Sequence, residues 1–328
     1  MEKFNRRDFI RLGAMGSLAL ASRGLVFAEP QTAPGGARTF KMKFAPGRGN
    51  EVFRTIAGKD PLKRLQFFKD QGFIAVEGIV WISHKPLSDK EKQMQQDIGD
   101  LAKKLGLEVG CMSSMNEKDF PTMSANQVPS KEKVIRDKSA IRDFLVWQMD
   151  NTFDILKRVG SKTFIIGPGT VDKELSWNKQ YDNVVENMAF CADYCKKNGF
   201  VMEIEPLNTT SHPNMFCDRA ELGARICEDV KSPNCKILYD LFHEQMQVGN
   251  LDSLDNPIVW KNIESFHIAD APGRKEPGSG NMDYMKIFKK IWDKGFRGIL
   301  GLEHGQSVQS AAVDEKILAT YRAFDAQV

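Results

Sequence analysis

The stretch Phe200-Val201-Met202-Glu203-Ile204-Glu205 is a short apolar run that ends in an acidic residue. Three later runs end in a similar way, at the residues that close 236–240, 264–267 and 298–303. The four closing residues are Glu205, Asp240, His267 and Glu303, and they are 35, 27 and 36 residues apart. Each interval is about the length of one strand followed by one helix, so the recurrence predicts parallel strands joined by helices.

The same alternation continues back to Phe40. We expect strands at residues 40–45, 73–79, 108–113, 162–166, 200–205, 235–240, 265–269 and 299–303. We expect helices at residues 61–71, 88–105, 140–159, 178–198, 219–230, near 250–260, 284–294 and 311–324, with a long connection after the third strand. Eight strands alternating with helices predict one α/β domain, a (β/α)8 TIM barrel over residues 39–328. A doubly wound sheet would need a glycine-rich phosphate turn, and Gly47-Arg48-Gly49 is too short a match.

Residues 1–28 have the pattern of an export signal. Arg6 and Arg7 precede a short apolar stretch, residues 12–21, and residues 26–28 offer the small side chains that a signal peptidase accepts. The apolar stretch is shorter than the roughly 20 residues of a membrane span. The alternative is a basic amphipathic helix on a soluble enzyme. We expect a twin-arginine signal peptide, recognition by the twin-arginine export machinery, a periplasmic or otherwise exported location, and a flexible leader over residues 29–38.

The charge balance argues against nucleic acid and anionic membranes as partners. The formal net charge is +3, and residues 1–28 alone carry five basic and two acidic side chains, so the remaining domain is close to neutral. The six cysteines contain no zinc-type CxxC pair. Cys191 and Cys195 are four residues apart on a predicted helix, which favours two buried thiols, and a domain of this size does not require disulfides.

The four strand-end residues suit a divalent cation. Residues at the carboxyl ends of successive strands in a parallel barrel converge on one mouth, where such enzymes carry out their chemistry. Glu205, Asp240, His267 and Glu303 would place three carboxylates and one imidazole there, a donor set that fits Mn²⁺, Mg²⁺ or Co²⁺ better than structural zinc. Taken singly, each residue also has an ordinary explanation as a helix cap, a surface acid or a packing histidine. Four such residues at four consecutive strand ends are harder to explain in that way.

Five stretches around these positions carry a further signal: residues 205–208 (Glu-Pro-Leu-Asn), 240–243 (Asp-Leu-Phe-His), 267–274 (His-Ile-Ala-Asp-Ala-Pro-Gly-Arg), 276–280 (Glu-Pro-Gly-Ser-Gly) and 301–303 (Gly-Leu-Glu). They resemble the xylose isomerase-like barrels of sugar isomerases and epimerases, closest to hydroxypyruvate isomerase. The resemblance implies that Glu205, Asp240, His267 and Glu303 bind the metal ion. It also implies that His243 and Arg274 bind substrate oxygens.

Three features depart from that resemblance. Hydroxypyruvate isomerases can carry Gln where this chain has His267, and the sugar epimerase branch uses His, so the branch stays open. Trp81 and His84 have no secure match. An export signal is also unexpected for a hydroxypyruvate enzyme.

The implied activity is a metal-dependent isomerisation or epimerisation of a small hydroxy-carbonyl or keto-sugar. A proton moves between adjacent carbons through an enediolate, and a divalent cation stabilises the negative charge on oxygen as a Lewis acid. Glu205 and Glu303 would exchange the proton as base and acid. Arg274 offers a planar fork for a substrate carboxylate or vicinal oxygens.

Other activities and roles remain open on the sequence. The chain is alternatively an exported metal-dependent lyase or hydrolase acting on 3-keto-glycosides, or a non-catalytic sugar-binding barrel. An endonuclease-like enzyme would need more histidines than the five present. Glu77 ends the second strand and either points into the mouth or away from it. Asp270 either orients His267 or caps the following turn, and Glu244 either supports His243 or is an exposed acid. A homo-oligomer is also left open.

Overall fold

Parallel strands form the centre of the compact unit that spans residues 36–328. The computed structural model describes residues 38–47, 52–80, 82, 86–115, 120–130 and 133–328. Seven strands form one parallel sheet in the order β1 (Lys43–Ala45), β11 (Ile299–Gly301), β10 (Ile263–His267), β9 (Cys235–Asp240), β8 (Val201–Ile204), β7 (Thr163–Ile166) and β4 (Met112–Met115). The short strand β2 (Ala75–Val76) pairs in parallel with β3 (Glu108–Val109), which immediately precedes β4.

Backbone hydrogen bonds close this sheet into a barrel. The Gly110 N–H donates to the Val76 carbonyl at 2.8 Å, and the Glu77 N–H donates to the Pro46 carbonyl at 3.3 Å. A parallel bridge between Gly47 and Glu77 lies at the same point, so β2 joins the strand before it and the strand after it. Because β1 also pairs with β11, the first and last barrel strands are neighbours. The predicted (β/α)8 barrel is therefore confirmed, with β3 and β4 forming one interrupted barrel strand.

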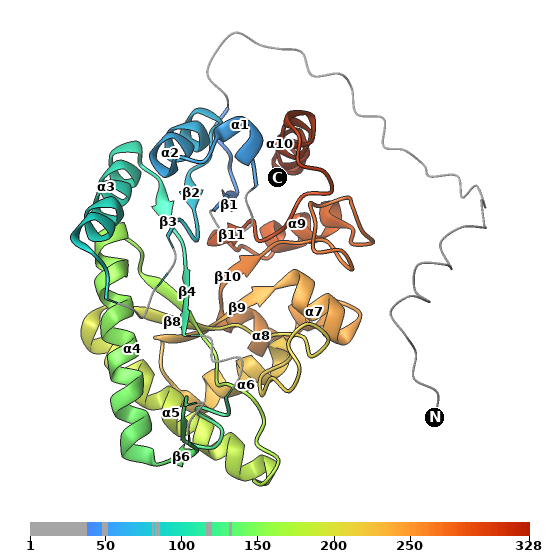
Figure 1. Ribbon diagram of the computed structural model, residues 1–328. Helices are drawn as coiled ribbons and strands as arrows, with labels where there is room; N and C mark the ends of the chain where they lie inside the picture. Colours follow the sequence, from blue (N-terminus) through green and yellow to red (C-terminus); the bar gives the residue numbers. More distant parts are fainter. Residues whose placement is uncertain (1–37, 48–51, 81, 83–85, 116–119, 131–132) are drawn as a thin grey trace, which may run out of the picture. The chain divides into compact units, whose positions relative to one another are not determined.

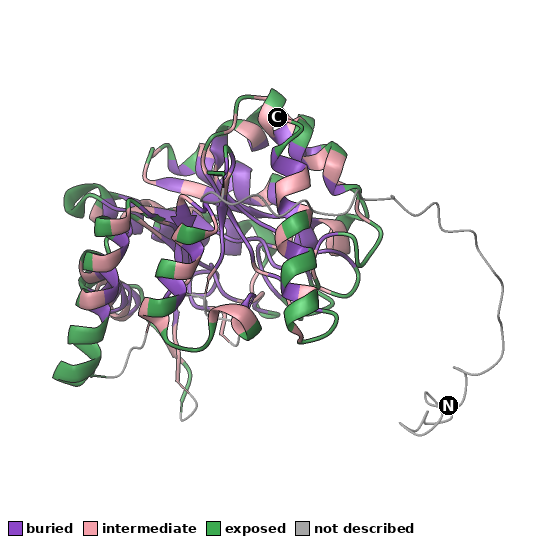
Figure 2. Ribbon diagram, turned by 90° about the horizontal axis from the view of Figure 1, so that it is seen from above, coloured by how far each residue is buried: buried purple, intermediate pink, exposed green. Residues whose placement is uncertain are grey.

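Helices surround the strands, as Figures 1 and 2 show. They are α1 (Arg54–Ala57), α2 (Pro61–Asp70), α3 (Asp89–Leu105), α4 (Lys138–Val159), α5 (Trp177–Asn198), α6 (Ala220–Val230), α7 (Leu241–Val248), α8 (Pro257–Asn262), α9 (Tyr284–Asp293) and α10 (Ala311–Asp325). Buried residues gather on the strands and on the helix faces that pack against them (Figure 2). Phe153 of α4, for example, stacks on Phe200 with ring centroids 4.4 Å apart. None of the helices that the structure describes has the length and apolar character to cross a membrane.

Helix ends follow local capping chemistry. Ser88 and Glu91 form a reciprocal capping box at the start of α3, and Asp137 caps α4 by accepting from the Ala140 N–H. Both helices end at a glycine in the left-handed conformation, Gly106 and Gly160. A residue without a Cβ adopts that conformation at little cost, so these glycines set where each helix stops.

Strand alternation decides which residues enter the barrel. Successive side chains of a strand point to opposite faces, so residues two apart share a face. On β8 and its extension, Met202 and Ile204 belong to the hydrophobic core under the helices, whereas Glu203 and Glu205 share the interior face. The same spacing relates Ser265 to His267 on β10. The barrel interior therefore carries polar groups at two depths.

The structure corrects the predicted elements in the second half of the barrel and in the long connection. The helix expected near residues 250–260 is present as a 3-10 turn, η2 (Asp252–Asp255), followed by α8, whereas α7, which begins directly after β9, was not predicted. The long connection contains a small antiparallel hairpin of β5 (Gln127–Val128) and β6 (Ile135–Arg136). α1 was also not predicted, and the first strand begins at Lys43 rather than at residue 40. The predicted signal peptide, residues 29–37 of the leader, Trp81 and His84 lie outside the described residues.

Candidate metal centre

The four predicted metal ligands lie together at the carboxyl ends of four neighbouring strands. Glu205 follows β8, Asp240 ends β9, His267 ends β10 and Glu303 follows β11. One donor atom from each residue lies within 4.8 Å of the donor atoms of the other three. The first three residues are buried and Glu303 is partly exposed. Strand register explains the convergence, because Asp240 pairs with His267 and His267 pairs with Gly301, two residues before Glu303.

The imidazole of His267 points one nitrogen at the three carboxylates. Its Nδ1 lies 3.0 Å from Glu303 Oε2, 3.6 Å from Glu205 Oε1 and 4.0 Å from Asp240 Oδ2. A neutral imidazole offers one lone pair, and here that lone pair can face the carboxylates only if the proton is on Nε2. The arrangement thus presents one nitrogen and three oxygens to a common point.

Asp240 has two separate tasks. Its Oδ1 accepts the backbone N–H groups of Phe242 and His243 at 2.7 and 2.9 Å, which caps the N-terminus of α7. Its Oδ2 is buried and faces the other ligands. One oxygen is therefore fixed by the backbone, and the other is left for a ligand.

The donor set fits a divalent cation. No described residue makes a well-aligned hydrogen bond to Asp240 Oδ2 or to His267 Nδ1, and both atoms are buried. An unsatisfied buried polar atom costs about 1–3 kcal/mol, so two of them facing one point indicate a missing partner. Oxygen-rich coordination with one imidazole is suited to Mn²⁺, Mg²⁺ or Co²⁺.

The electrostatics of the cluster also favour a positive charge at its centre. Burial raises the pKa of Asp240 to about 6, and the Glu303 carboxylate adds to the rise while Arg274 opposes it. Burial would also raise the pKa of Glu303, but His267 and Arg274 outweigh it and hold that pKa well below its usual range. A cation among the carboxylates would favour their ionised forms in the same way.

His243 is held so that one nitrogen faces the site. Its Nδ1 lies 3.3 Å from the Asn208 backbone N and 2.6 Å from Asn208 Nδ2, both of which can donate to it. This leaves the proton on Nε2, which is buried, lies 3.7 Å from Asp240 Oδ2 and makes no hydrogen bond to a described residue. Burial lowers the pKa of His243 to about 4, so the ring is neutral at physiological pH. Its Nε2–H thus faces the ligand cluster without a hydrogen-bond acceptor among the described residues.

Arg274 covers the mouth beside Glu303. Its Nη2 donates to Glu303 Oε2 at 2.7 Å and lies 3.8 Å from Asp240 Oδ2. The guanidinium also stacks over Phe242, 5.3 Å from the ring centroid. The backbone of Arg274 is left-handed (φ 53°), which is uncommon for a residue other than glycine and is often found at functional sites. The predicted substrate-binding position is therefore next to the predicted ligands.

Two open roles are now settled by geometry. Asp270 does not orient His267: its carboxylate accepts the backbone N–H groups of Gly278, Gly280 and Met282 at 2.8–3.1 Å, and so fixes the loop that carries Arg274. Glu244 neither supports His243 nor is an exposed acid, because its side chain is buried elsewhere. Its carboxylate accepts from the Ala220 N–H at 2.8 Å and from Ser253 Oγ at 2.7 Å, which caps α6 instead.

Glu77 does point into the barrel, and it contacts His267. Its Oε1 lies against His267 Nε2, whereas the other ring nitrogen, Nδ1, faces the other three carboxylates. Cys111 Sγ donates to the same Oε1 at 2.9 Å. Burial raises the pKa of the Cys111 thiol well above its usual value, so it remains a neutral donor. The sequence offered no signal for the contact between Cys111 and Glu77.

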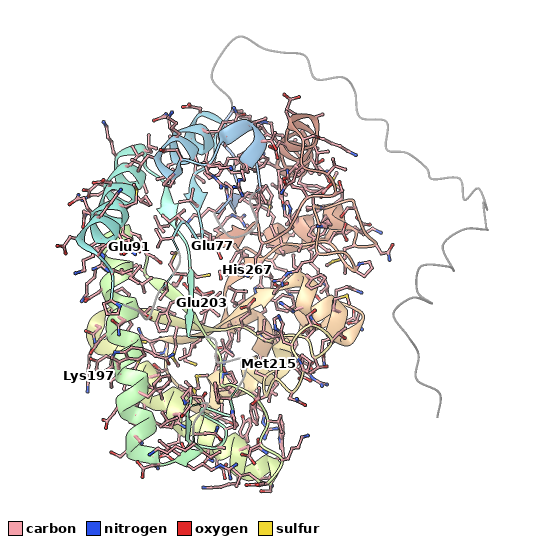
Figure 3. The ribbon with its side chains drawn as sticks, in the orientation of Figure 1. Glu77, Glu91, Lys197, Glu203, Met215 and His267 are labelled. Carbon is pink, nitrogen blue, oxygen red and sulfur yellow. The ribbon has the colours of Figure 1, made fainter. Side chains whose placement is uncertain are left out.

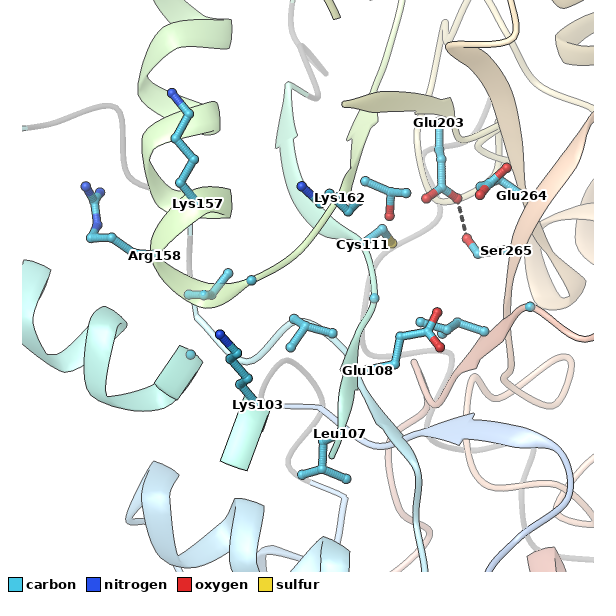
Figure 4. A pocket seen from close by; sticks show the side chains of 18 of the residues that line it. Lys103, Leu107, Glu108, Cys111, Lys157, Arg158, Lys162, Glu203, Glu264 and Ser265 are labelled. Carbon is cyan, nitrogen blue, oxygen red and sulfur yellow. Dashed lines mark hydrogen bonds between the residues drawn. The ribbon is translucent and has the colours of Figure 1, made fainter. Parts of the chain in front are cut away.

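A separate cavity of about 580 Å³ opens at the amino-terminal end of the barrel (Figure 4). Its inner end includes Glu203, Ser265 and Cys111, and its rim includes the basic side chains Lys103, Lys157, Arg158 and Lys162. Ser265 Oγ donates to Glu203 Oε2. This cavity lies at the end of the barrel opposite the four predicted ligands, and parallel barrels keep their catalytic groups at the carboxyl end. The cluster of Glu205, Asp240, His267 and Glu303 is therefore the candidate active site.

Comparison with known proteins places the chain among related barrels. The family model described as xylose isomerase-like TIM barrel matches residues 65–321. A putative hydroxypyruvate isomerase from Xenopus laevis is 27% identical over 196 residues, 58% of this chain and 69% of that protein. The 2-oxo-tetronate isomerase of Cupriavidus necator is 33% identical over 121 residues, 37% and 46% of the two chains. The hydroxypyruvate isomerase of Escherichia coli is 28% identical over 179 residues, 54% and 64%. The matched regions thus span about half to two thirds of these relatives.

Solved structures share the fold at lower sequence identity. An AP endonuclease of family 2 from Brucella melitensis has a TM-score of 0.65 at 20% identity, covering 86% of this chain and 98% of that chain. A 3-keto-D-glucoside 4-epimerase from Escherichia coli has a TM-score of 0.65 at 18% identity, covering 86% and 100%. At these identities the likeness concerns the fold alone.

Proposed function

The chain belongs to the xylose isomerase-like TIM barrel family, and we propose that it is a divalent-metal-dependent isomerase or epimerase. In this proposal it moves a proton between adjacent carbons of a small hydroxy-carbonyl compound or keto-sugar. The observation that carries the proposal is the convergence of Glu205, Asp240, His267 and Glu303, whose donor atoms lie within 4.8 Å of one another. Two of these atoms, Asp240 Oδ2 and His267 Nδ1, are buried and have no hydrogen-bond partner among the described residues. The relatives matched by sequence are isomerases by name, which supports the reaction class.

The chain's own residues supply the proton chemistry. Glu205 and Glu303 approach from strands on either side of β9 and β10, and each carries a carboxylate suited to remove or return a proton. The Arg274 guanidinium, which donates to Glu303 Oε2 at 2.7 Å, favours the ionised form of Glu303, as a base requires. A divalent cation held by the four ligands would stabilise the negative charge that develops on the substrate oxygen.

His243 and Arg274 indicate which chemical groups the substrate must carry. The neutral His243 presents an N–H donor, and Arg274 presents a planar fork that suits a carboxylate or two adjacent oxygens. Together with relatives named for hydroxypyruvate and 2-oxo-tetronate, this favours a small hydroxy-keto acid over a long glycoside. We further propose, from the Arg6-Arg7 pattern, that the protein is exported through the twin-arginine machinery.

The test is turnover in deuterated water followed by NMR. The full chain is stripped with a chelator and given hydroxypyruvate, ketohexoses or 3-keto-glycosides, with Mn²⁺, Mg²⁺, Co²⁺ or no metal. We expect a rearranged product that carries solvent deuterium beside the carbonyl, formed only with metal. Glu205→Gln and Glu303→Gln should abolish it, whereas Glu203→Gln, on the same face of β8 two residues earlier, should not.

Other outcomes would contradict the proposal in different ways. Fragmented products would indicate a lyase or hydrolase. Substrate binding without turnover under every condition would indicate a sugar-binding barrel. Turnover that survives both the chelator and the two glutamine substitutions would show that the cluster is not the active site.

A further inference from the structure

The contact between Glu77 and His267 lies outside the ligand cluster, and nothing in the proposed reaction accounts for it. Both side chains are buried, with 6% and 4% of their residue surface exposed. They come from β2 and β10, strands that are not neighbours in the barrel, so the contact crosses the barrel interior. The two residues lie close together in the middle of the barrel in Figure 3.

The barrel wall is shaped to accommodate the Glu77 side chain. A Cβ at Gly301 of β11 would lie 2.2 Å from Glu77 Oε2, and a Cβ at Gly110 would lie 3.3 Å from Glu77 Cγ. At Gly47 a Cβ would lie 2.0 Å from the Glu77 backbone carbonyl oxygen. Glycines on the strands around Glu77 therefore leave the space that its backbone and carboxylate occupy. A side chain packed in this way has little freedom to move.

The contact with Glu77 determines which ring nitrogen of His267 is available to a metal ion. A carboxylate only accepts hydrogen bonds, so the ring nitrogen that touches Glu77 Oε1 must carry a proton. That nitrogen is Nε2, so a neutral His267, the form that can bind a cation, has its unprotonated Nδ1 facing Glu303, Glu205 and Asp240. Histidines that bind metals commonly donate their second N–H to a carboxylate, which sets both tautomer and ring orientation.

We propose that Glu77 is a positioning residue that holds His267 with Nδ1 aimed at the metal ion. Cys111 donates to the same oxygen, Glu77 Oε1, at 2.9 Å and helps to hold the carboxylate in place. The inference rests on the proposed function, because it assumes that the ligand cluster holds a cation.

A second cation bound by Glu77, Cys111 and His267 is the alternative explanation for why these three side chains lie close together. Their donor atoms also lie within 4.8 Å of one another. Among the described residues this group offers only three donors, and the direct contact between Glu77 Oε1 and His267 Nε2 leaves no room for an ion between them. Such an ion would also require one imidazole to bridge two metals. A single ion with Glu77 outside its coordination sphere is the simpler arrangement.

The first experiment measures Mn²⁺ binding to the full chain by electron paramagnetic resonance. Glu77→Ala should raise the Kd for Mn²⁺ about 10- to 100-fold, the usual effect of removing a carboxylate behind a metal-binding histidine. Glu77→Gln should have a smaller effect, since its amide oxygen still accepts a hydrogen bond. Glu203→Gln is the matched control: it alters another buried carboxyl of the barrel interior and should leave the Kd within twofold.

The second experiment needs no substitution. Nitrogen-15 NMR of the Mg²⁺-loaded wild-type chain, labelled at histidine, should show Nε2 of His267 protonated and Nδ1 unprotonated. A proton on Nδ1 would overturn the proposal even if both Glu77 variants failed to fold, and so would binding of two Mn²⁺ ions per chain. If the wild-type chain binds no Mn²⁺, the proposed function fails. If the wild type binds Mn²⁺ and Glu77→Ala binds it equally well, only the role of Glu77 fails.

Discussion

Glu203 allows a quantitative test of the barrel interior that is independent of catalysis. Its side chain is fully buried, Ser265 Oγ donates to Oε2, and Oε1 makes no hydrogen bond to a described residue. Burial raises the pKa of this carboxyl from its ordinary 4.5 to about 8. The hydroxyls of Ser265 and Thr163 oppose the rise, and the carboxylates of Glu264 and Glu77 add to it. The folded protein therefore prefers Glu203 protonated.

The sign of the effect on stability follows from proton counting. Between pH 4.5 and 8 the folded state binds more protons at Glu203 than the unfolded state, so stability falls as pH rises through this window and is level above it. With about 1.36 kcal/mol per pKa unit, the loss between pH 5 and pH 8 is about 3 to 4 kcal/mol. Glu203→Gln keeps the shape of the side chain and removes this titration.

The assay is urea unfolding of the wild type and Glu203→Gln at pH 5, 6, 7 and 8. Other ionisable groups contribute to both proteins, so the quantity that matters is the difference between their free energies of unfolding. We expect the free energy of unfolding of Glu203→Gln, minus that of the wild type, to increase by about 3 to 4 kcal/mol from pH 5 to pH 8. This corresponds to a relative shift of the urea midpoint of about 1 M. If the free energies of unfolding of the two proteins changed with pH in the same way, Glu203 would not be a neutral acid in the folded barrel, and the reasoning would be refuted.

Two further predictions concern the metal-centre end of the barrel. His243→Phe keeps a planar ring but removes the Nε2–H donor, and it should raise KM about 2- to 10-fold, the value of one hydrogen bond, while the Kd for Mn²⁺ stays unchanged. A KM equal to that of the wild type would exclude His243 from substrate binding. Gly301→Ala puts a Cβ 2.2 Å from Glu77 Oε2 and should weaken Mn²⁺ binding about 10-fold by displacing that carboxylate. Gly273→Ala, whose new Cβ would meet only Lys275 at 3.6 Å, is its control, and equal Kd values for the two variants would contradict the displacement.

The sequence predicted most of the fold because buried strands and amphipathic helices leave separate periodic patterns. The eight barrel strands and the long helices lie where expected, with ends shifted by a few residues. Short elements were missed, and α7 is the instructive case. Its eight residues are too few for a clear helical period, and it begins only because Asp240 caps it. Asp240 caps the helix with Oδ1 and turns Oδ2 toward the other predicted ligands, so a cap role and a ligand role do not exclude each other.

The convergence of Glu205, Asp240, His267 and Glu303 could be predicted for a related reason. They end strands that are consecutive in the chain, so adjacency in sequence becomes adjacency in the barrel. The position of Glu77 could not be settled in this way, because the apolar run around it continues through Ile79 and Val80 and does not mark where the strand ends. Its contact with His267 spans 190 residues and exists only once the barrel has closed.

Glu203 of β8 and Glu205, which directly follows β8, show how depth in a barrel changes the chemical behaviour of identical side chains. Glu203 and Glu205 share one face of one strand, and nothing in their local sequence separates them. Glu205 reaches the mouth, where donor atoms from three other strands and the Arg274 guanidinium gather around it. Glu203 lies one layer deeper, where its side chain is fully buried and Ser265 is its hydrogen-bonding partner, so burial raises its pKa and its carboxyl is neutralised by a proton. Which glutamate joins the predicted ligand cluster is thus decided by the strands opposite it, and those strands are fixed by closure of the barrel.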